Sequence, residues 1–354
     1  MKQEKTQVSL TASQIAGVYI GAVIGAGFAS GQEIWQFFGL LGRGGFLGLM
    51  LSSVLFAAFA FLLLELGRRL AARSHLEVVT QVAGRFWGSF LDAFLTVSLP
   101  ATLMVMLAGA GAGLAEQYSV PVFVGSTAMM LATIITVLMG IQGVVSAISL
   151  MAPFLLGIIL LICVLALRVR VVDWSWALAS VKPGMSWLMS ALSYVAYNLL
   201  LSVSILAPMG AVAERQAILW GAVLGGLGLG ISATAVNVAV LSQGPAVIGC
   251  DVPMLLVAKK ALPHATWVFT VLLIVEIYTT AVASLYGFGA RLAPRDPATF
   301  ERLTVITGCV ALVGGQVGFT RLVAVIYGTM GYVGAAFLLI LTWWAIRDVK
   351  SRPH

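Results

Sequence analysis

The amino-acid sequence predicts an all-α polytopic membrane protein with ten transmembrane helices. Hydrophobic residues make up 60% of its 354 residues and charged residues only 9%, whereas soluble domains carry about 25% charged residues. The mean hydropathy is +1.04, and apolar residues are spread along the whole chain. These values exclude a soluble enzyme, a nucleic-acid-binding protein and a disordered protein.

Ten apolar runs are long enough to cross a bilayer, which takes about 20 residues. The connections between them are too short for a second domain, so we expect one transmembrane domain over residues 1–354. The first run lacks a convincing cleavage site and nine more runs follow, so we interpret it as a membrane span and not as a signal peptide. The predicted spans are 13–40, 44–67, 87–115, 121–139, 143–167, 185–213, 216–242, 265–289, 303–319 and 322–346.

Lysine and arginine predict the orientation, because cytoplasmic loops are enriched in both. With ten spans and a cytoplasmic N-terminus, thirteen of the 20 Lys and Arg residues lie on the cytoplasmic side and seven on the other. We therefore expect both termini in the cytoplasm, and a multi-pass protein of the bacterial inner membrane in contact with the lipid bilayer.

The first span is interrupted by glycines at its centre. Residues 21–33 read GAVIGAGFASGQE, so three glycines within seven positions are followed at once by Ser30, Gln32 and Glu33. Glycine costs about 1 kcal/mol relative to alanine inside a helix, and polar groups in hydrocarbon cost more. We expect non-helical backbone between about Ile24 and Ser30. The alternative is that the small residues serve close helix packing.

The sixth span carries a less distinct interruption. Asn198, Ser202 and Ser204 lie at mid-depth, and Pro208 follows, which predicts a second break; the alternative is a proline kink with serines bonded to their own helix. Broken first and sixth helices divide the chain into two five-helix halves, about 11–170 and 183–348. Halves with an odd number of spans enter the membrane from opposite sides, which is the inverted repeat of secondary transporters.

Residue spacing predicts a cation site between the first and the eighth span. The carbonyls of Gly21 and Ile24 are three positions apart and lie near the end of the first half-helix, where carbonyls lack intrahelical partners. In the eighth span, the Glu276 carbonyl and the hydroxyls of Thr279 and Thr280 share one helix face. Five oxygens of this kind suit sodium. The alternative is that the threonines bond back to their own helix.

Two acids within the predicted spans are further candidates. Glu33 and Glu276 each lie inside an apolar span, and an intramembrane carboxylate is a functional hypothesis by default because it is costly to bury. Glu65 is different, since Arg68 and Arg69 lie three and four residues after it at a membrane edge.

The residues Ile24 to Phe28, IGAGF, resemble the broken first helix of the amino acid–polyamine–organocation superfamily. More narrowly, Gly25 to Glu33, GAGFASGQE, resemble the YkvI-type bacterial membrane proteins. The resemblance implies the LeuT-type 5+5 inverted-repeat fold. It assigns sodium to Gly21, Ile24, Glu276, Thr279 and Thr280, and a substrate carboxylate to the amides of Gly25, Ala26 and Gly27. Gln32 and Glu33 depart from the superfamily pattern, and an acid so close to these amides would repel a carboxylate unless it were protonated.

The sequence therefore predicts a secondary active transporter that works by alternating access. Its expected substrate is a small polar solute resembling an amino acid or an amine, coupled to sodium or protons, with substrate contacts at Gly25, Ala26, Gly27, Ser30, Gln32, Glu33, Asn198 and Ser202. The alternative is a ligand-sensing membrane subunit of germination-receptor type that binds without transporting. We expect neither an enzyme nor a cofactor nor a nucleic-acid partner, and the oligomeric state stays open.

Overall fold

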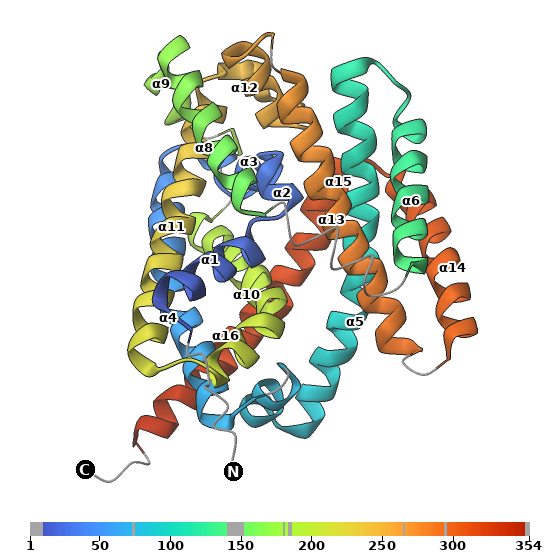
Figure 1. Ribbon diagram of the computed structural model, residues 1–354. Coiled ribbons are helices and arrows are strands. Elements are labelled where there is room, and N and C mark those ends of the chain that lie inside the picture. Colours follow the sequence, from blue (N-terminus) through green and yellow to red (C-terminus); the bar gives the residue numbers. More distant parts are fainter. Residues whose placement is uncertain are drawn as a thin grey trace, which may run out of the picture.

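The computed structural model describes residues 10–72, 75–139, 152–179, 181–182, 186–264, 266–293 and 296–350. Helices make up nearly all regular structure within these ranges, and one isolated bridge pairs Leu10 with Ala213. Among these described residues, seven helical segments are long and apolar enough to cross a membrane. They are α4 (Arg43–Leu70), α5 (His75–Tyr118), α10 (Trp187–Ala211), α11 (Arg215–Leu241), α13 (Thr266–Leu292), α14 (Pro297–Gly315) and the run Phe319–Arg347 (Figure 1).

The run Phe319–Arg347 is formed by three consecutive elements, the last of which extends to Lys350. These are α15 (Phe319–Leu322), the π-helical turn η3 (Val323–Tyr327) and α16 (Gly328–Lys350). The described part of the chain also contains shorter apolar helices: α1 (Ala12–Val23), α6 (Val122–Leu138) and α8 (Ala152–Val169). The chain is thus a multi-pass, all-α membrane protein.

Each of the ten predicted spans contains helix, although residues 143–151 of the fifth lie outside the described residues. The third span begins earlier than expected, because α5 starts at His75 and runs through a non-helical Gly84 with φ +76°. Three short elements occupy connections that the sequence predicts as loops. They are α9 (Trp174–Ala177), η2 (Gly244–Val247) and α12 (Pro253–Ala261).

The predicted break in the sixth span is wrong. Helix α10 is continuous from Trp187 to Ala211. The Asn198 side-chain amide donates to the Tyr194 carbonyl (2.9 Å) and the Ser204 hydroxyl to the Leu201 carbonyl (2.9 Å). These polar groups are therefore satisfied within the helix and require no unwinding. Pro208 lies in the last turn, where the helix is about to end.

Close backbone contact fixes α10 against α4. A Cβ atom on Gly67 would overlap the Ala207 carbonyl, and one on Gly210 would overlap the Leu64 carbonyl. Only glycine at these two positions allows the helices to approach so closely, which is how small residues hold membrane helices together. This crossing holds α10 next to α1, whose Ile15, Tyr19 and Val23 are buried.

The first and sixth helices run in opposite directions. Leu10 precedes α1, Ala213 follows α10, and the two residues pair with each other, so the start of α1 and the end of α10 lie at the same end of the molecule. Helices α9 and α12 lie at the other end (Figure 1). Opposite entry of the two halves of the chain into a membrane requires this arrangement.

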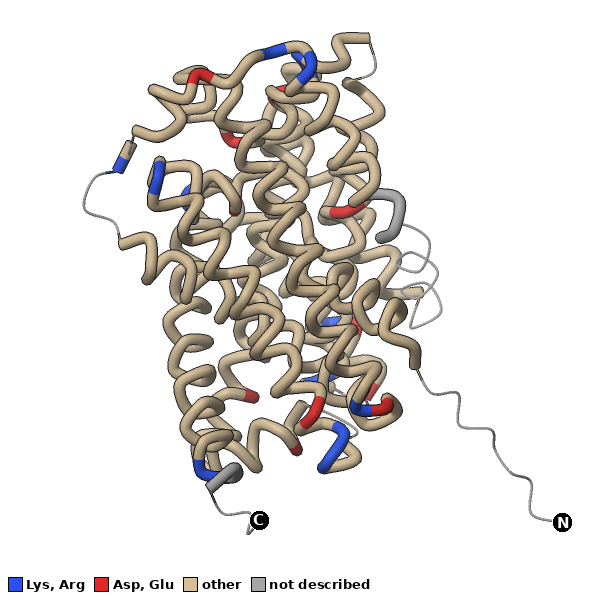
Figure 2. The backbone as a smooth tube through the Cα atoms, turned by 90° about the vertical axis from the view of Figure 1, so that its left-hand side faces the viewer, with Lys and Arg blue, Asp and Glu red and all other residues tan. Residues whose placement is uncertain are grey.

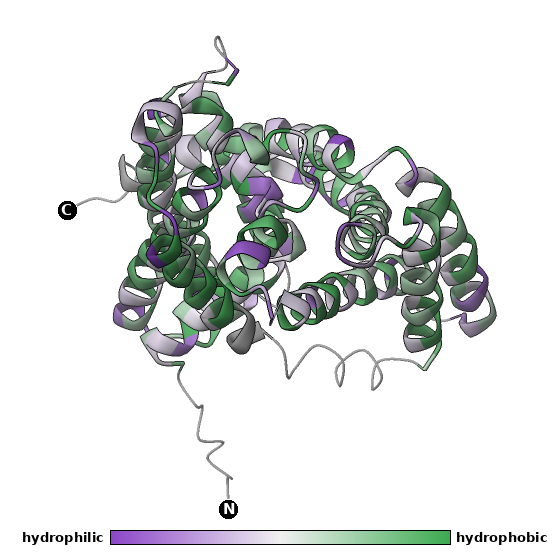
Figure 3. Ribbon diagram, turned by 90° about the horizontal axis from the view of Figure 1, so that it is seen from above, coloured by the Kyte–Doolittle hydropathy of each residue, from purple (hydrophilic) through white to green (hydrophobic). Residues whose placement is uncertain are grey.

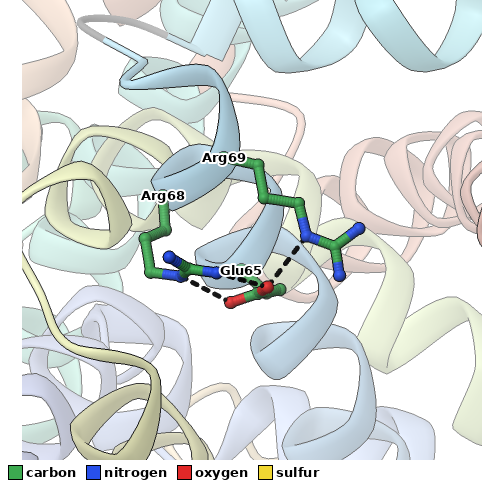
Figure 4. A network of polar contacts seen from close by, with 3 residues as sticks. All are labelled: Glu65, Arg68 and Arg69. Atoms are coloured by element: carbon green, nitrogen blue, oxygen red, sulfur yellow. Dashed lines mark hydrogen bonds and ion pairs between the residues drawn. The ribbon is translucent and has the colours of Figure 1, made fainter.

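Charge and hydropathy follow the pattern of a membrane protein. Most lysines, arginines and acids lie toward the two ends of the bundle (Figure 2). Viewed from above, hydrophobic residues dominate the outer helix faces, and hydrophilic segments lie near the middle (Figure 3). The expected role of Glu65 is confirmed, because at the end of α4 it binds Arg68 at 2.8 and 2.9 Å and Arg69 at 2.8 Å (Figure 4).

Candidate substrate and ion cavity at the first helix break

The first predicted break is confirmed at its first two residues. Helix α1 ends at Val23, and Ile24 (φ −77°, ψ 102°) and Gly25 (φ −118°, ψ −170°) are extended. The next residues differ from the prediction, since α2 (Ala26–Ala29) re-forms one helical turn closed by a bond from the Ala29 amide to the Gly25 carbonyl (2.9 Å). The short segments α1, α2 and α3 (Gln32–Phe37) follow one another from the level of α10 toward α12 (Figure 1).

Gly31 separates α2 from α3 with a φ of +77°, a backbone conformation that favours glycine. A side chain would also be excluded there, because a Cβ atom would meet Met254 Cγ at 2.8 Å. The chain thus turns twice within about eight residues, which places Glu33 back beside α2.

A cavity of about 350 Å³ opens at this break. It is bounded by the end of α1, by α5, by the middle of α10, by α13 and by Tyr327. The volume suits a small solute. Most of the predicted site residues line it together, although they come from three separate parts of the sequence: Gly21, Ile24, Gly25, Ala26, Glu33, Asn198, Glu276, Thr279 and Thr280.

Four of the predicted substrate contacts lie outside this cavity. Ser30 donates to the Gly27 carbonyl (2.9 Å) and accepts from the Gln32 amide (3.2 Å), so it stabilises the turn between α2 and α3. Gln32 points to α15 and donates to Thr320 (3.1 Å). Ser202 is buried in α10, and Gly27 packs against the Glu33 side chain. Ser30 therefore stabilises the turn, whereas the buried hydroxyl of Ser202 has no hydrogen-bond partner among the described residues.

Glu33 is held between two partners. The Tyr197 hydroxyl of α10 donates to its Oε2 atom. On the other side, a Cβ atom on Gly27 would overlap the Cγ, Cδ and Oε1 atoms of Glu33. The absence of a side chain at position 27 is therefore what makes room for this carboxyl group, which is only 5% exposed.

The predicted cation ligands of α13 face the cavity together with the end of α1. The Thr279 hydroxyl donates its only hydrogen to the Glu276 carbonyl (3.0 Å), and its oxygen keeps lone pairs for another partner. Gly21 and Ile24 line the same cavity, and the last carbonyls of a helix such as α1 lack intrahelical partners. The two halves of the predicted sodium site thus meet around one space.

The carboxylate of Glu276 has neither a hydrogen bond nor an ion pair within the part of the chain that the structure describes, although the residue is 8% exposed. A buried charge without a partner costs several kcal/mol. A proton or a bound cation would neutralise this charge and remove the cost.

Two aromatic residues of the cavity escaped the sequence analysis. Tyr197 and Tyr327 stack with ring centroids 5.1 Å apart and an angle of 8° between the planes, and both line the cavity. Tyr327 ends a π-helical turn, and such turns occur frequently at functional sites. Glycines follow Tyr327 at positions 328, 331 and 334, but no acid, asparagine or glutamine near it indicated a place in the cavity.

A polar network covers the cavity on the side of α9 and α12. The Met254 amide donates to the Ser30 carbonyl (2.9 Å), and Thr320 donates to Asp251 (2.5 Å) while accepting from Gln32. At the end of α5, Glu116 accepts from the amides of residues 251 and 252 at 3.0 and 3.2 Å. This network ties the turn after the break to three other helices.

Some residues that line the cavity are exposed. Gly21, in the last turn of α1, is exposed, and Ile205 of α10 is 42% exposed. The described polar contacts therefore cover the cavity toward α12, whereas the lining is less buried at these two positions.

Sequence comparison finds similarity to two proteins of Bacillus subtilis strain 168. The chain is 29% identical to the membrane protein YkvI over 333 residues, which is 93% of this chain and 94% of YkvI. It is 26% identical to the protein YyaD over 331 residues, covering 92% and 95% of the two chains. No family model matches the sequence.

Comparison with solved structures identifies the fold. MhsT, solved in complex with L-phenylalanine, superposes with a TM-score of 0.63 at 18% identity over 95% of this chain and 90% of MhsT. Mhp1 in an inward-facing conformation gives 0.59 at 14% identity over 94% and 76% of the chains. A manganese transporter of Eremococcus coleocola gives 0.57 at 13% identity over 98% and 79%. The chain thus has the LeuT-like fold that the sequence resemblance implies.

Proposed function

We propose that this chain is a secondary active transporter that carries a small amine- or amino-acid-like solute by alternating access. The observation that carries the proposal is the single cavity at the α1–α2 break. It combines the ends of a broken helix, two carboxyl groups and two threonine hydroxyls. Secondary transporters bind substrate and coupling ion near such discontinuous helices.

The similarity to solved structures also supports a role in transport. MhsT binds L-phenylalanine in its solved complex, and the Eremococcus protein is named a manganese transporter. The fold therefore serves both an organic solute and a cation.

Sodium and protons are both supported as coupling ions, by different residues. Gly21, Ile24, Thr279 and Thr280 offer uncharged oxygens around the cavity, which suits sodium, and Glu276 adds its carbonyl. The unpartnered carboxylate of Glu276 suits a proton. We further propose two inverted repeats, about 11–170 and 183–348, with both termini in the cytoplasm of a bacterium.

The proposal is tested with the purified full-length chain, first in detergent and then in proteoliposomes. Melting temperatures are measured in sodium chloride and in potassium chloride across a panel of amines and amino acids. A ligand at 100 times its Kd adds about 2.7 kcal/mol of stability, which a melting curve resolves. Every stabilising solute is then tested for uptake under an imposed sodium or proton gradient.

Uptake separates transport from sensing. A transporter accumulates the solute inside the vesicles above its external concentration, and an ionophore that collapses the gradient abolishes the accumulation. A receptor subunit of germination-receptor type would bind the solute at a fixed stoichiometry without accumulation. Binding without accumulation therefore contradicts the proposed function.

A further inference from the structure

The described residues that line the cavity include two acids and no basic side chain. Glu33 and Glu276 line it, and the described residues around them include no lysine, arginine or histidine. Both acids are at least nine-tenths buried. A solute that enters therefore meets negative charge or protonated acids, and no fixed positive charge that could bind an anionic group.

Glu33 is positioned to receive a donor from the cavity. The Tyr197 hydroxyl binds one of its oxygens, whereas an ionised carboxylate offers about four acceptor positions. The ring of Tyr197 is stacked against Phe37 (5.7 Å) and Tyr327 (5.1 Å). The stack prevents the hydroxyl from moving away, so the carboxylate stays oriented with free acceptor capacity.

The residues around Glu33 suit an organic molecule with an apolar part rather than a bare ion. Tyr327, Leu99 and Met106 line the same cavity and provide aromatic and aliphatic surface. A small ligand with an apolar part would bury that part here and direct a polar head toward Glu33. Cations are also attracted to aromatic rings.

Glu276 is placed to bind the coupling ion, which is a second cation beside the solute. Its carboxylate has no hydrogen-bonding or ion-pair partner within the described residues, and it lies on the helix that also carries Thr279 and Thr280. A proton or a sodium ion at this end of the cavity balances its charge. Glu33 then remains as the group that selects the solute.

The substrate class follows from these residues if the chain has the proposed function. We propose that the solute is an organic amine cation without a carboxylate, whose ammonium group binds Glu33. A carboxylate on the same solute would lie among two acids with no cationic side chain to pair with. The cavity therefore discriminates against amino acids and in favour of the corresponding amines.

The experiment uses matched pairs of probes that differ by one carboxylate. Phenethylamine is compared with phenylalanine, 3-methylbutylamine with leucine, and cadaverine with lysine. Binding to the full-length chain in detergent is measured by melting curves and by calorimetry, in sodium chloride at pH 7.5. We expect at least one amine to bind at least tenfold more tightly than its amino acid.

Two variants test whether the preference for amines depends on Glu33 in the cavity. Glu33→Gln keeps the shape of the side chain and an oxygen for Tyr197, and it should weaken binding of the preferred amine at least tenfold. Glu301→Gln makes the same change at an exposed position of α14 and should leave binding unchanged. Each variant's melting temperature without ligand reports whether it is folded.

Three results would overturn the proposed substrate class. They are tighter binding of the amino acid than of its amine in every pair that binds, unchanged amine binding in a folded Glu33→Gln variant, and no stabilisation by any amine of the panel. None of these bears on transport itself, because an amino acid could still accumulate in proteoliposomes. Amine binding without accumulation, in contrast, would refute the transporter and leave the binding preference intact.

Discussion

Adding one methyl group at Gly27 should destabilise the protein far more than adding one at Gly25. In Gly27→Ala the new Cβ atom overlaps three atoms of the Glu33 side chain, from Cγ to Oε1. The whole side chain must move, not only its tip, and its hydrogen bond with Tyr197 is lost with it. At Gly25 a Cβ atom meets nothing within 4 Å, and its φ of −118° accepts any residue.

The magnitude follows from two contributions. Overpacking a well-packed site costs about 1–3 kcal/mol, and losing a hydrogen bond to a charged group costs about 1.5–3 kcal/mol. Because the carboxyl group keeps some access to the cavity, we expect a total of about 2–4 kcal/mol for Gly27→Ala. Gly25→Ala should stay within about 0.5 kcal/mol of the parent.

The assay is thermal unfolding of the purified variants, extended to a double-mutant cycle with Glu33→Ala. Once Glu33 is an alanine, the methyl group at position 27 has room, so Gly27→Ala should cost much less in that background. A coupling free energy of at least about 1 kcal/mol between the two positions is expected. Equal melting temperatures of Gly27→Ala and Gly25→Ala, or additive effects in the cycle, would refute the packing of Glu33 against Gly27.

Three further predictions concern the ion site and the polar contacts of Glu116 beside α12. The double variant Thr279→Ala, Thr280→Ala should lose the stabilisation by sodium while Thr127→Ala keeps it; a full sodium response in the double variant contradicts the site. Glu276→Gln should raise the melting temperature without ligand at alkaline pH, because it removes an unpartnered buried charge; a lower melting temperature there contradicts this reading. Burial, and to a lesser extent Glu116, raises the pKa of Cys250 to about 12, so at pH 8 the thiol is protonated and should react slowly with maleimide. Glu116→Gln should speed that reaction, as measured by mass spectrometry, and rapid labelling of the folded parent would disagree.

The sequence allowed much of the cavity to be predicted because helix faces and breaks have simple rules. Glycines followed by polar residues indicated the break at Ile24 and Gly25, and the spacing of Thr279 and Thr280 placed them on one face of α13. The resemblance to the LeuT-type fold implied that the first and the eighth span meet. The structure accordingly gathers Gly21, Ile24 and the α13 residues around one cavity.

The remaining features depend on contacts that no local pattern encodes. Asn198 and Ser204 satisfy their polar groups within α10, so the same residue types that predicted a break stabilise a continuous helix. Gln32 lies one residue before Glu33, yet its side chain binds Thr320 in a distant part of the chain. Tyr327 reaches the cavity only through the turn of η3 and its stacking on Tyr197.

The most direct test of transport through this cavity is uptake of the preferred solute into proteoliposomes that contain the full-length chain. We expect accumulation above the external concentration when an inward sodium or proton gradient is imposed, and only equilibration when an ionophore removes it. Glu276→Gln, or the double threonine variant, should uncouple accumulation from the gradient of the coupling ion. Binding of the solute without any accumulation under either gradient would contradict a transporter and indicate a protein that only senses its ligand.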